Sequence, residues 1–242
     1  MIEIKNLTKR FGDSLVVDDL SFTVEDGSIT GFIGPNGSGK TTTLKMVTGV
    51  LTPTEGTVLL NGIDIARHSI EAKRQFGFVS DSPDHFLRLT GLEYVNFMAD
   101  MYDVPSEGRG RIIQDYAERF DIAQALNTKI LAYSHGMRQK IMIIGCLIHN
   151  PSIWILDEPM LGLDPQSAFE LKKMMKEHIQ NGNSVLFSTH ILEVAEKLCD
   201  KVVIIKKGKL KYTGSVENLC AQNEGCSLEE IFLKLTGKNA NE

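Results

Sequence analysis

The stretch GPNGSGKTT, from Gly34 to Thr42, joins an apolar segment, Ile29 to Ile33, to a helix-like one that runs from Gly39 to Val50. It matches the pattern G-x-x-x-x-G-K-[ST], which binds phosphates where a strand precedes it and a helix follows. Both flanking elements are expected here, because the first segment is short and apolar and the second keeps helical spacing. The sequence therefore predicts a polyphosphate-binding loop.

The composition of this loop suits a polyphosphate. Glycines remove the Cβ atoms that would hold the backbone away, and they permit positive φ, so that successive N–H groups can point inward. The following helix presents its positive dipole end to the anion. Lys40 adds a charge for the β- and γ-phosphates, and the Thr41 hydroxyl is a candidate Mg²⁺ ligand. The predicted binding residues are Gly34, Pro35, Asn36, Gly37, Ser38, Gly39, Lys40, Thr41 and Thr42.

Composition limits the class of protein. The chain has 242 residues, 42% hydrophobic and 24% charged, with a net charge of −5. These values fit one or two globular domains and argue against a nucleic-acid partner. The longest apolar run, Ile141 to Ile148, is far shorter than a membrane span, and the first residues lack a signal-peptide core. We therefore expect a soluble, cytoplasmic chain. Its four cysteines lack Cys-x-x-Cys spacing and are expected to be free thiols rather than metal ligands.

Strands alternate with helices along most of the chain, which predicts a parallel α/β sheet. The block from Thr90 to Asn150 instead repeats apolar residues at helical spacing, and we expect a helical insertion there. A frayed tail is expected from Gly237 to Glu242. The expected strands are Ile2 to Phe11, Ser14 to Val24, Ile29 to Ile33, Thr57 to Leu60, Phe76 to Val79, Ile153 to Leu156, Ser184 to Phe187 and Val202 to Ile205, and helices are expected at Pro165 to Gln180 and Ile191 to Leu198.

Two strand ends carry groups suited to hydrolysis. SIWILDEP, from Ser152 to Pro159, is an apolar strand that ends in two carboxylates. Asp157 at the tip suits Mg²⁺, and Glu158 is placed to act as a general base on a water molecule. FSTH, from Phe187 to His190, ends in hydroxyls and an imidazole that could donate to a γ-phosphate.

A second helix start has the features of an anion site. YSHGMRQK, from Tyr133 to Lys140, precedes an apolar helix. Ser134 is a natural N-cap and Gly136 permits close approach. One chain then has one nucleotide loop but two phosphate-binding ends. The simplest resolution is that the second end serves the nucleotide of another chain.

Taken in this order, the motifs resemble those of the nucleotide-binding subunit of ATP-binding cassette (ABC) transporters over roughly residues 1 to 235. Gly34 to Thr42 is similar to Walker A, Ile153 to Glu158 to Walker B, and Leu161 to Pro165 to the D-loop that would bring Asp164 to the nucleotide. His190 resembles the switch histidine and Tyr133 to Met137 the signature. Phe11 matches the aromatic that stacks on adenine, although it could be an ordinary strand aromatic, and Val16 would flank the ribose.

The resemblance implies a P-loop NTPase (RecA-like) α/β core with an N-terminal antiparallel β subdomain and an inserted α-helical subdomain. The core would comprise residues 1–80 and 151–242, and the insert residues 81–150. It implies a MgATP-dependent ATPase with Glu158 and His190 as catalytic residues and Thr41, Asp81 and Asp157 at the metal. Two chains would pair head to tail and hold two ATP molecules between them.

The resemblance also implies peripheral attachment to integral membrane subunits at the cytoplasmic face. A cleft beside Ser82 to Leu89 would receive a helix of that partner through Phe86, Leu87 and Leu89, or these residues belong to the core of the insert. SHGMRQK, DEPMLGLDP and LEEIFLKLTG resemble exporter-type subunits more than importers.

This sequence departs from the family pattern at two places. The signature L-S-G-G-Q is here Tyr133-Ser134-His135-Gly136-Met137, so that His135 replaces a glycine and either adds a donor or points away. Asp81 stands where the family usually has glutamine, which puts the usual contact with water and Mg²⁺ in doubt.

The rival hypothesis is a soluble, non-transport ABC ATPase acting on DNA or ribosomes. The 53 positions from Asp81 to Ser134 are too few for the long coiled coil of chromosome-type relatives. Only one cassette is present, whereas ribosome-type relatives generally have two. A cassette that binds without turnover is disfavoured by Glu158 and His190.

Overall fold

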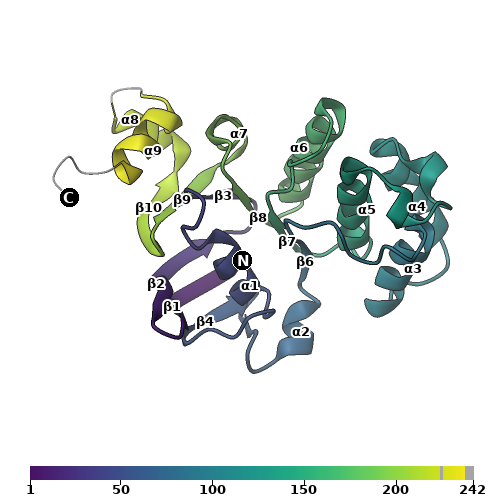
Figure 1. Cartoon of the computed structure of the whole chain (residues 1–242), viewed down its shortest axis with the longest axis horizontal. Helices are drawn as coiled ribbons and strands as arrows, with labels where there is room; N and C mark the ends of the chain where they lie inside the picture. The colour runs from purple at the N-terminus through teal and green to yellow at the C-terminus, as the bar shows by residue number, and fades with distance from the viewer. Residues whose placement is uncertain (224–225, 238–242) are drawn as a thin grey trace.

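The computed structural model, which describes residues 1–223 and 226–237, is an α/β fold built on two sheets (Figure 1). The strands of the larger sheet are β3 (Ile29–Ile33), β6 (Phe76–Val79), β7 (Ile153–Asp157), β8 (Ser184–Thr189), β9 (Lys201–Lys206) and β10 (Lys209–Ser215). Their order is β10-β9-β3-β8-β7-β6, and every neighbouring pair is parallel except β9 and β10. The predicted parallel α/β sheet is confirmed.

The central strands of this sheet are mostly apolar, and both faces of the sheet are covered. Every residue of β3, β7 and β8 is buried, as expected for parallel strands packed on two sides. Asp157 pairs with Ser188, and Ile33 pairs with Thr189. The carboxyl ends of these three strands therefore lie together, and they bring the phosphate loop, the two carboxylates and His190 to one edge.

The smaller sheet is the predicted N-terminal antiparallel unit. Its strands are β1 (Ile2–Phe11), β2 (Ser14–Val24), β4 (Glu55–Leu60) and β5 (Ile63–Asp64), in the order β2-β1-β4-β5. Side chains such as Ile2, Leu7 and Val24 on its inner face share one apolar cluster with Phe32 of β3 and Leu44. This sheet thus covers one face of the larger sheet.

Nine α-helices are present in the described part of the chain. They are α1 (Lys40–Val47), α2 (Ser69–Lys73), α3 (Gly91–Met101), α4 (Arg109–Arg119), α5 (His135–Leu147), α6 (Pro165–Gln180), α7 (Leu192–Leu198), α8 (Val216–Ala221) and α9 (Leu228–Thr236), and two 3₁₀ turns are η1 (Ala123–Ala125) and η2 (Ile130–Ala132). Figure 1 shows α3, α4 and α5 grouped on one side of the molecule, and the N-terminal sheet on the other. This group is the predicted helical insertion.

The inserted helices share a core with the sheet. One apolar cluster contains Val95 of α3, Phe120 after α4 and Ile144 of α5, together with Leu156 and Phe187 of the sheet. The insertion therefore packs as a layer against the sheet. This shared core fixes where the start of α5 lies.

The structure corrects several element boundaries. The helix expected from Gly39 to Val50 ends at Val47, where the Thr48 hydroxyl donates to Leu44 O at 2.9 Å. The strand expected from Thr57 begins at Glu55. Five elements were not predicted from the sequence, namely β5, β10, α2, α8 and α9, and the expected tail lies outside the described residues except for Gly237. The four cysteines are free thiols, as expected.

Candidate functional site

The phosphate loop lies between β3 and α1 and forms the floor of a groove of about 260 Å³. Gly39, the residue before α1, has φ 104°, and a Cβ there would lie 2.9 Å from Val16 O. Glycine is needed at this position on both counts. The residues lining the groove are Val16, Asn36, Gly37, Ser38, Gly39, Lys40, Thr41, Thr42, Asp81 and Glu158. The structure thus gathers most of the predicted nucleotide residues.

The Lys40 ammonium lies inside the loop. Its Nζ donates to Gly34 O at 2.7 Å, and Pro35 O lies 3.5 Å away. Burial lowers the pKa of Lys40, whereas the nearby carboxylates of Glu158 and Asp157 act in the opposite direction. A cation held by carbonyl groups in this way is directed at whatever anion the loop binds.

Asp157 is the buried carboxylate of the site. The Ser188 hydroxyl donates to its Oδ1, while Oδ2 is buried with no hydrogen-bond partner in the described part of the chain. Burial raises the pKa of Asp157, and the hydroxyls of Ser188 and Thr41 offset part of that rise. An orphaned carboxylate oxygen beside a threonine hydroxyl fits a divalent cation.

The protein ligands available to such a cation are few, which is typical of Mg²⁺. No group of three or more His, Cys, Asp or Glu side chains is arranged as a metal site within residues 1–223 and 226–237. Mg²⁺ is usually bound by one or two carboxylates together with substrate phosphates. Asp157 and Asp81 could supply the carboxylates, since Asp81 lines the same groove and its charge adds to the rise in the pKa of Asp157.

Glu158 points into the groove from an uncommon backbone conformation. Its φ is 49°, a region that non-glycine residues seldom adopt. Its amide donates to Ser188 Oγ at 2.9 Å, and its Oε2 lies 3.0 Å from His190 Nδ1. Ser188 therefore holds the carboxylate of Asp157 and the backbone of Glu158, and His190 orients the carboxylate of Glu158. Sequence reasoning missed the role of Ser188, although the hydroxyls that end its strand were the available signal.

Phe11 and Asp164 lie outside the residues that line the groove. Phe11 ends β1, is half exposed, and has Lys9 Nζ 5.1 Å from its ring centre. Asp164 caps α6 by accepting from Ser167 N at 2.9 Å, and its other oxygen lies 2.7 Å from Lys140 Nζ. The bond from Lys140 holds the pKa of Asp164 well below its usual range. Roles at a nucleotide stay predictions for both residues.

The second predicted anion-binding end is at the start of α5. Ser134 is its N-cap and accepts from Met137 N at 3.3 Å, which confirms the predicted cap. Neither Ser134 nor Gly136 is among the described residues that line the groove over the phosphate loop. The two predicted anion-binding ends of the chain are therefore separate.

The close approach at Gly136 is to the chain itself. A Cβ there would lie 2.5 Å from Gly162 O, and a Cβ at Gly162 would lie 2.3 Å from Cδ2 of the His135 ring. The loop from Leu161 to Asp164 thus rests on the first turn of α5. The Lys140–Asp164 pair fastens the two segments further. Sequence reasoning missed Lys140, because nothing near it in the sequence indicates its partner.

A family model described as ABC transporter matches residues 17–161. The chain belongs to the ABC transporter family. The ABC-type transporter ATP-binding protein EcsA of Bacillus subtilis is 33% identical over 242 residues, 99% of this chain and 98% of that protein. The Nod factor export ATP-binding protein I of Burkholderia lata is 32% identical over 235 residues, 96% of this chain and 76% of that protein.

Solved structures of ABC ATP-binding subunits have the same fold as this chain. A structure described as the ATP binding subunit of an ABC transporter has a TM-score of 0.92 at 32% identity, covering 97% of this chain and 99% of that one. The dimeric ATP-binding cassette MJ0796, in a post-hydrolysis state with ADP and Pi, has a TM-score of 0.79 at 25% identity, covering 89% and 99%. The present chain is an ATP-binding subunit of this family with a P-loop NTPase fold, and its activity is ATP hydrolysis.

Proposed function

We propose that this ABC subunit powers a transporter as a head-to-tail pair with two composite ATP sites. The observation that carries the proposal is the separation of the two anion-binding ends. The groove over the phosphate loop is lined by Lys40 and Glu158 but, among the described residues, not by Ser134 or Gly136. A second copy that offers its α5 start to this groove would complete the site. The dimeric form of the related cassette MJ0796 supports this arrangement.

Mg²⁺ would be held by Thr41 and Asp157, with Asp81 as the second carboxylate. The cation supplies charge neutralisation at the β- and γ-phosphates when it is bound. Asp157 contributes the otherwise unpartnered Oδ2, and Ser188 keeps this carboxylate oriented through Oδ1. Asp81 stands where the family usually has glutamine. It therefore presents a charged carboxylate to the groove rather than an amide, on a shorter side chain.

Glu158 would take the proton of the attacking water. Its αL backbone, held by the hydrogen bond that its amide donates to Ser188 Oγ, aims the carboxylate into the groove. His190, 3.0 Å from that carboxylate, keeps it in one rotamer and presents its other nitrogen to the γ-phosphate. ATP would thus be closed in by the partner's signature and released after hydrolysis, and this opening and closing would drive transport.

The membrane subunits would contact a groove of about 460 Å³ that lies beside Asp81. Phe86, one of the residues predicted to meet a partner helix, lines this groove and is half exposed. Leu87 and Leu89 instead pack against the core of the helical layer. In the described part of the chain, no helix has both the length and the apolar character to cross a bilayer. The Nod factor export relative supports assignment to the exporter-type branch.

Co-purification tests this function against a soluble, non-transport ABC ATPase. The tagged chain, purified from detergent-solubilised membranes of its own host, is expected to elute as an ATP-hydrolysing complex with a membrane subunit. Phe86→Glu should abolish the complex, whereas Ile70→Glu, at an exposed apolar side chain of α2 outside this groove, should not. Recovery of the chain on ribosomes or DNA, with no membrane subunit, would contradict the proposal.

A further inference from the structure

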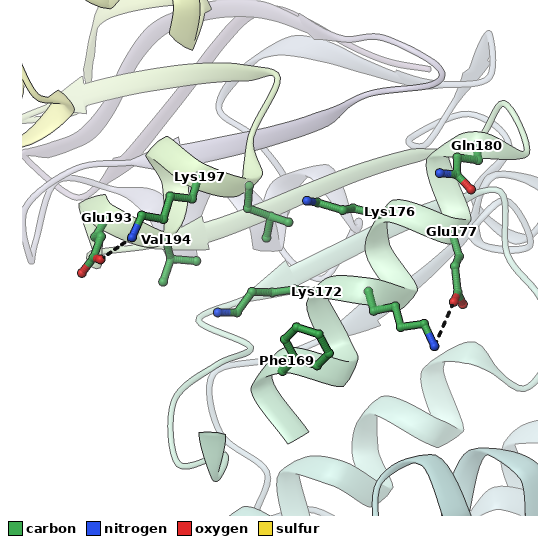
Figure 2. A pocket seen from close by; sticks show the side chains of 10 residues that line it. Phe169, Lys172, Lys176, Glu177, Gln180, Glu193, Val194 and Lys197 are labelled. Carbon is green, nitrogen blue, oxygen red and sulfur yellow. Dashed lines mark hydrogen bonds and ion pairs between the residues drawn. The ribbon is translucent and has the colours of Figure 1, made fainter. Parts of the chain in front are cut away.

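A second groove lies between α6 and α7 (Figure 2). It has a volume of about 610 Å³, larger than the groove over the phosphate loop. It is lined by Phe169, Lys172, Lys173, Lys176, Glu177, Gln180, Glu193, Val194, Lys197 and Leu198. None of these residues serves the ATP site described above.

The floor of this groove is apolar. Phe169 on α6 is 68% exposed, which is unusual for a large aromatic side chain on a folded surface. Val194 and Leu198 of α7 face it across the groove, and their side chains pack against the core below. An exposed aromatic beside apolar groups is typical of a contact surface.

The rim is basic although the chain as a whole is acidic. Four lysines against two glutamates give the groove an excess of two positive charges, on a chain whose net charge is −5. Lys173 pairs with Glu177 at 3.7 Å and Lys197 with Glu193 at 2.7 Å (Figure 2). No carboxylate lies within ion-pair distance of Lys172 or Lys176 in the structure described.

Lys172 and Lys176 make no close ion pair in the described part of the chain. Lys172 and Lys176 are four residues apart on α6, so that they lie on one face and repel each other. Their presence beside an apolar floor favours an anionic partner, because opposite charges across an interface attract it and orient it.

We propose that this groove binds an amphipathic helix of a partner protein, apolar along one face and flanked by Asp and Glu. From Phe169 to Gln180 the groove follows α6 for about 16 Å, the length of roughly three helical turns. A helix laid in such a groove inserts apolar side chains at i, i+3 or i+4 and i+7. The acidic flanks pair with Lys172 and Lys176.

The position of the groove links the partner to the ATP site. α6 begins directly after Asp164, its N-cap, and α7 begins two residues after His190. A bound helix therefore contacts both α6 and α7, the two helices that follow Asp164 and His190. The proposal does not depend on which cargo or membrane subunit the transporter uses.

Binding of a designed probe tests the proposal on the full chain. The probe is a fluorescent peptide of about 14 residues with leucines on one face and glutamates on the other, compared with a counterpart in which lysines replace the glutamates. Fluorescence anisotropy is expected to show at least about tenfold tighter binding of the acidic peptide. The double variant Lys172→Glu/Lys176→Glu should weaken binding of the acidic peptide about tenfold. The control Lys207→Glu/Lys211→Glu, with the same change in net charge, should stay within about twofold.

Phe169→Ala keeps every charge and should also weaken binding of the acidic peptide about tenfold, because it removes the apolar anchor. Unchanged ATP hydrolysis in each variant shows that the chain is folded. An equal loss of affinity for the acidic peptide in both double variants, or no binding of the parent chain at about 100 µM peptide, would overturn the proposal. So would binding of anionic phospholipid vesicles in place of the peptide, or a change in self-association caused by Lys172→Glu/Lys176→Glu, since these outcomes assign the groove to a membrane or to a second copy.

Discussion

At the scale of single residues, the site depends on how Ser188 and His190 hold two adjacent carboxylates. Asp157 and Glu158 were predictable from the sequence because a buried strand ends in them. The αL backbone of Glu158 was not, since a positive φ at a non-glycine residue is imposed by tertiary contacts. The bond from Glu158 N to Ser188 Oγ, at 2.9 Å, is one such contact.

Glu158→Gln is expected to lower kcat by about 10² to 10⁴-fold while ATP binding stays intact. The amide keeps the size of the side chain but cannot accept the proton of the attacking water. Phosphate release and nucleotide titration measure the two effects. Glu71→Gln, at an exposed carboxylate of α2, is the control and should leave both unchanged. A kcat within about threefold of the parent would refute the general-base role.

At the scale of elements, the start of α5 and the loop before α6 form one unit. The cap at Ser134 was predicted from local sequence because N-capping is a local interaction. The contact between the His135 ring and Gly162 was not, because the two positions are distant in sequence and meet only through packing. The sequence alone left open whether His135 adds a donor or points away, and the structure places its ring against this loop.

Gly136→Ala should destabilise this unit. The added methyl would lie 2.5 Å from Gly162 O, a backbone atom, and overpacking of this kind costs about 1 to 3 kcal/mol. Gly110→Ala is the matched control, because Gly110 also lies at the second position of its helix, with no atom within 4 Å of the added methyl. It should raise the free energy of unfolding by about 0.5 to 1 kcal/mol. Urea unfolding measures both, and equal effects would contradict the packing argument.

At the scale of the whole molecule, the architecture was largely predictable from the sequence, but the edge strand of the larger sheet was not. Alternating strands and helices predicted the parallel sheet, since continuous apolar segments such as β3 and β7 must be covered on both faces. The antiparallel β10 was missed, because its residues alternate in burial at the sheet edge and carry a weak hydrophobic signal. Among the nucleotide residues, the phosphate loop came together as predicted, whereas Phe11 lies outside its groove.

The packed core also predicts acid sensitivity. His178 of α6 is buried and stacked on Trp154, and burial lowers its pKa to about 4. In the unfolded chain His178 is therefore protonated near pH 6.5, whereas in the folded chain it is protonated only near pH 4. The free energy of unfolding should fall as the pH falls through this window, by about 3 kcal/mol at most for this group, and level off below it. His178→Phe, which keeps a stacked ring, should show a correspondingly smaller loss between pH 7 and pH 4, and an unchanged loss would contradict this account.

The central claim, that each ATP site is shared by two chains, is tested most directly by mixing two inactive variants. Ser134→Arg blocks the signature and Lys40→Ala removes the phosphate-binding cation. Alone, each variant should lose hydrolysis, because every site of its dimer contains one lesion. In a mixed head-to-tail dimer both lesions fall in one site and leave the other whole. An equal mixture is therefore expected to recover about a quarter of the parent ATPase activity per chain. Activity no greater than that of the separate variants, or full activity of Ser134→Arg alone, would contradict the claim.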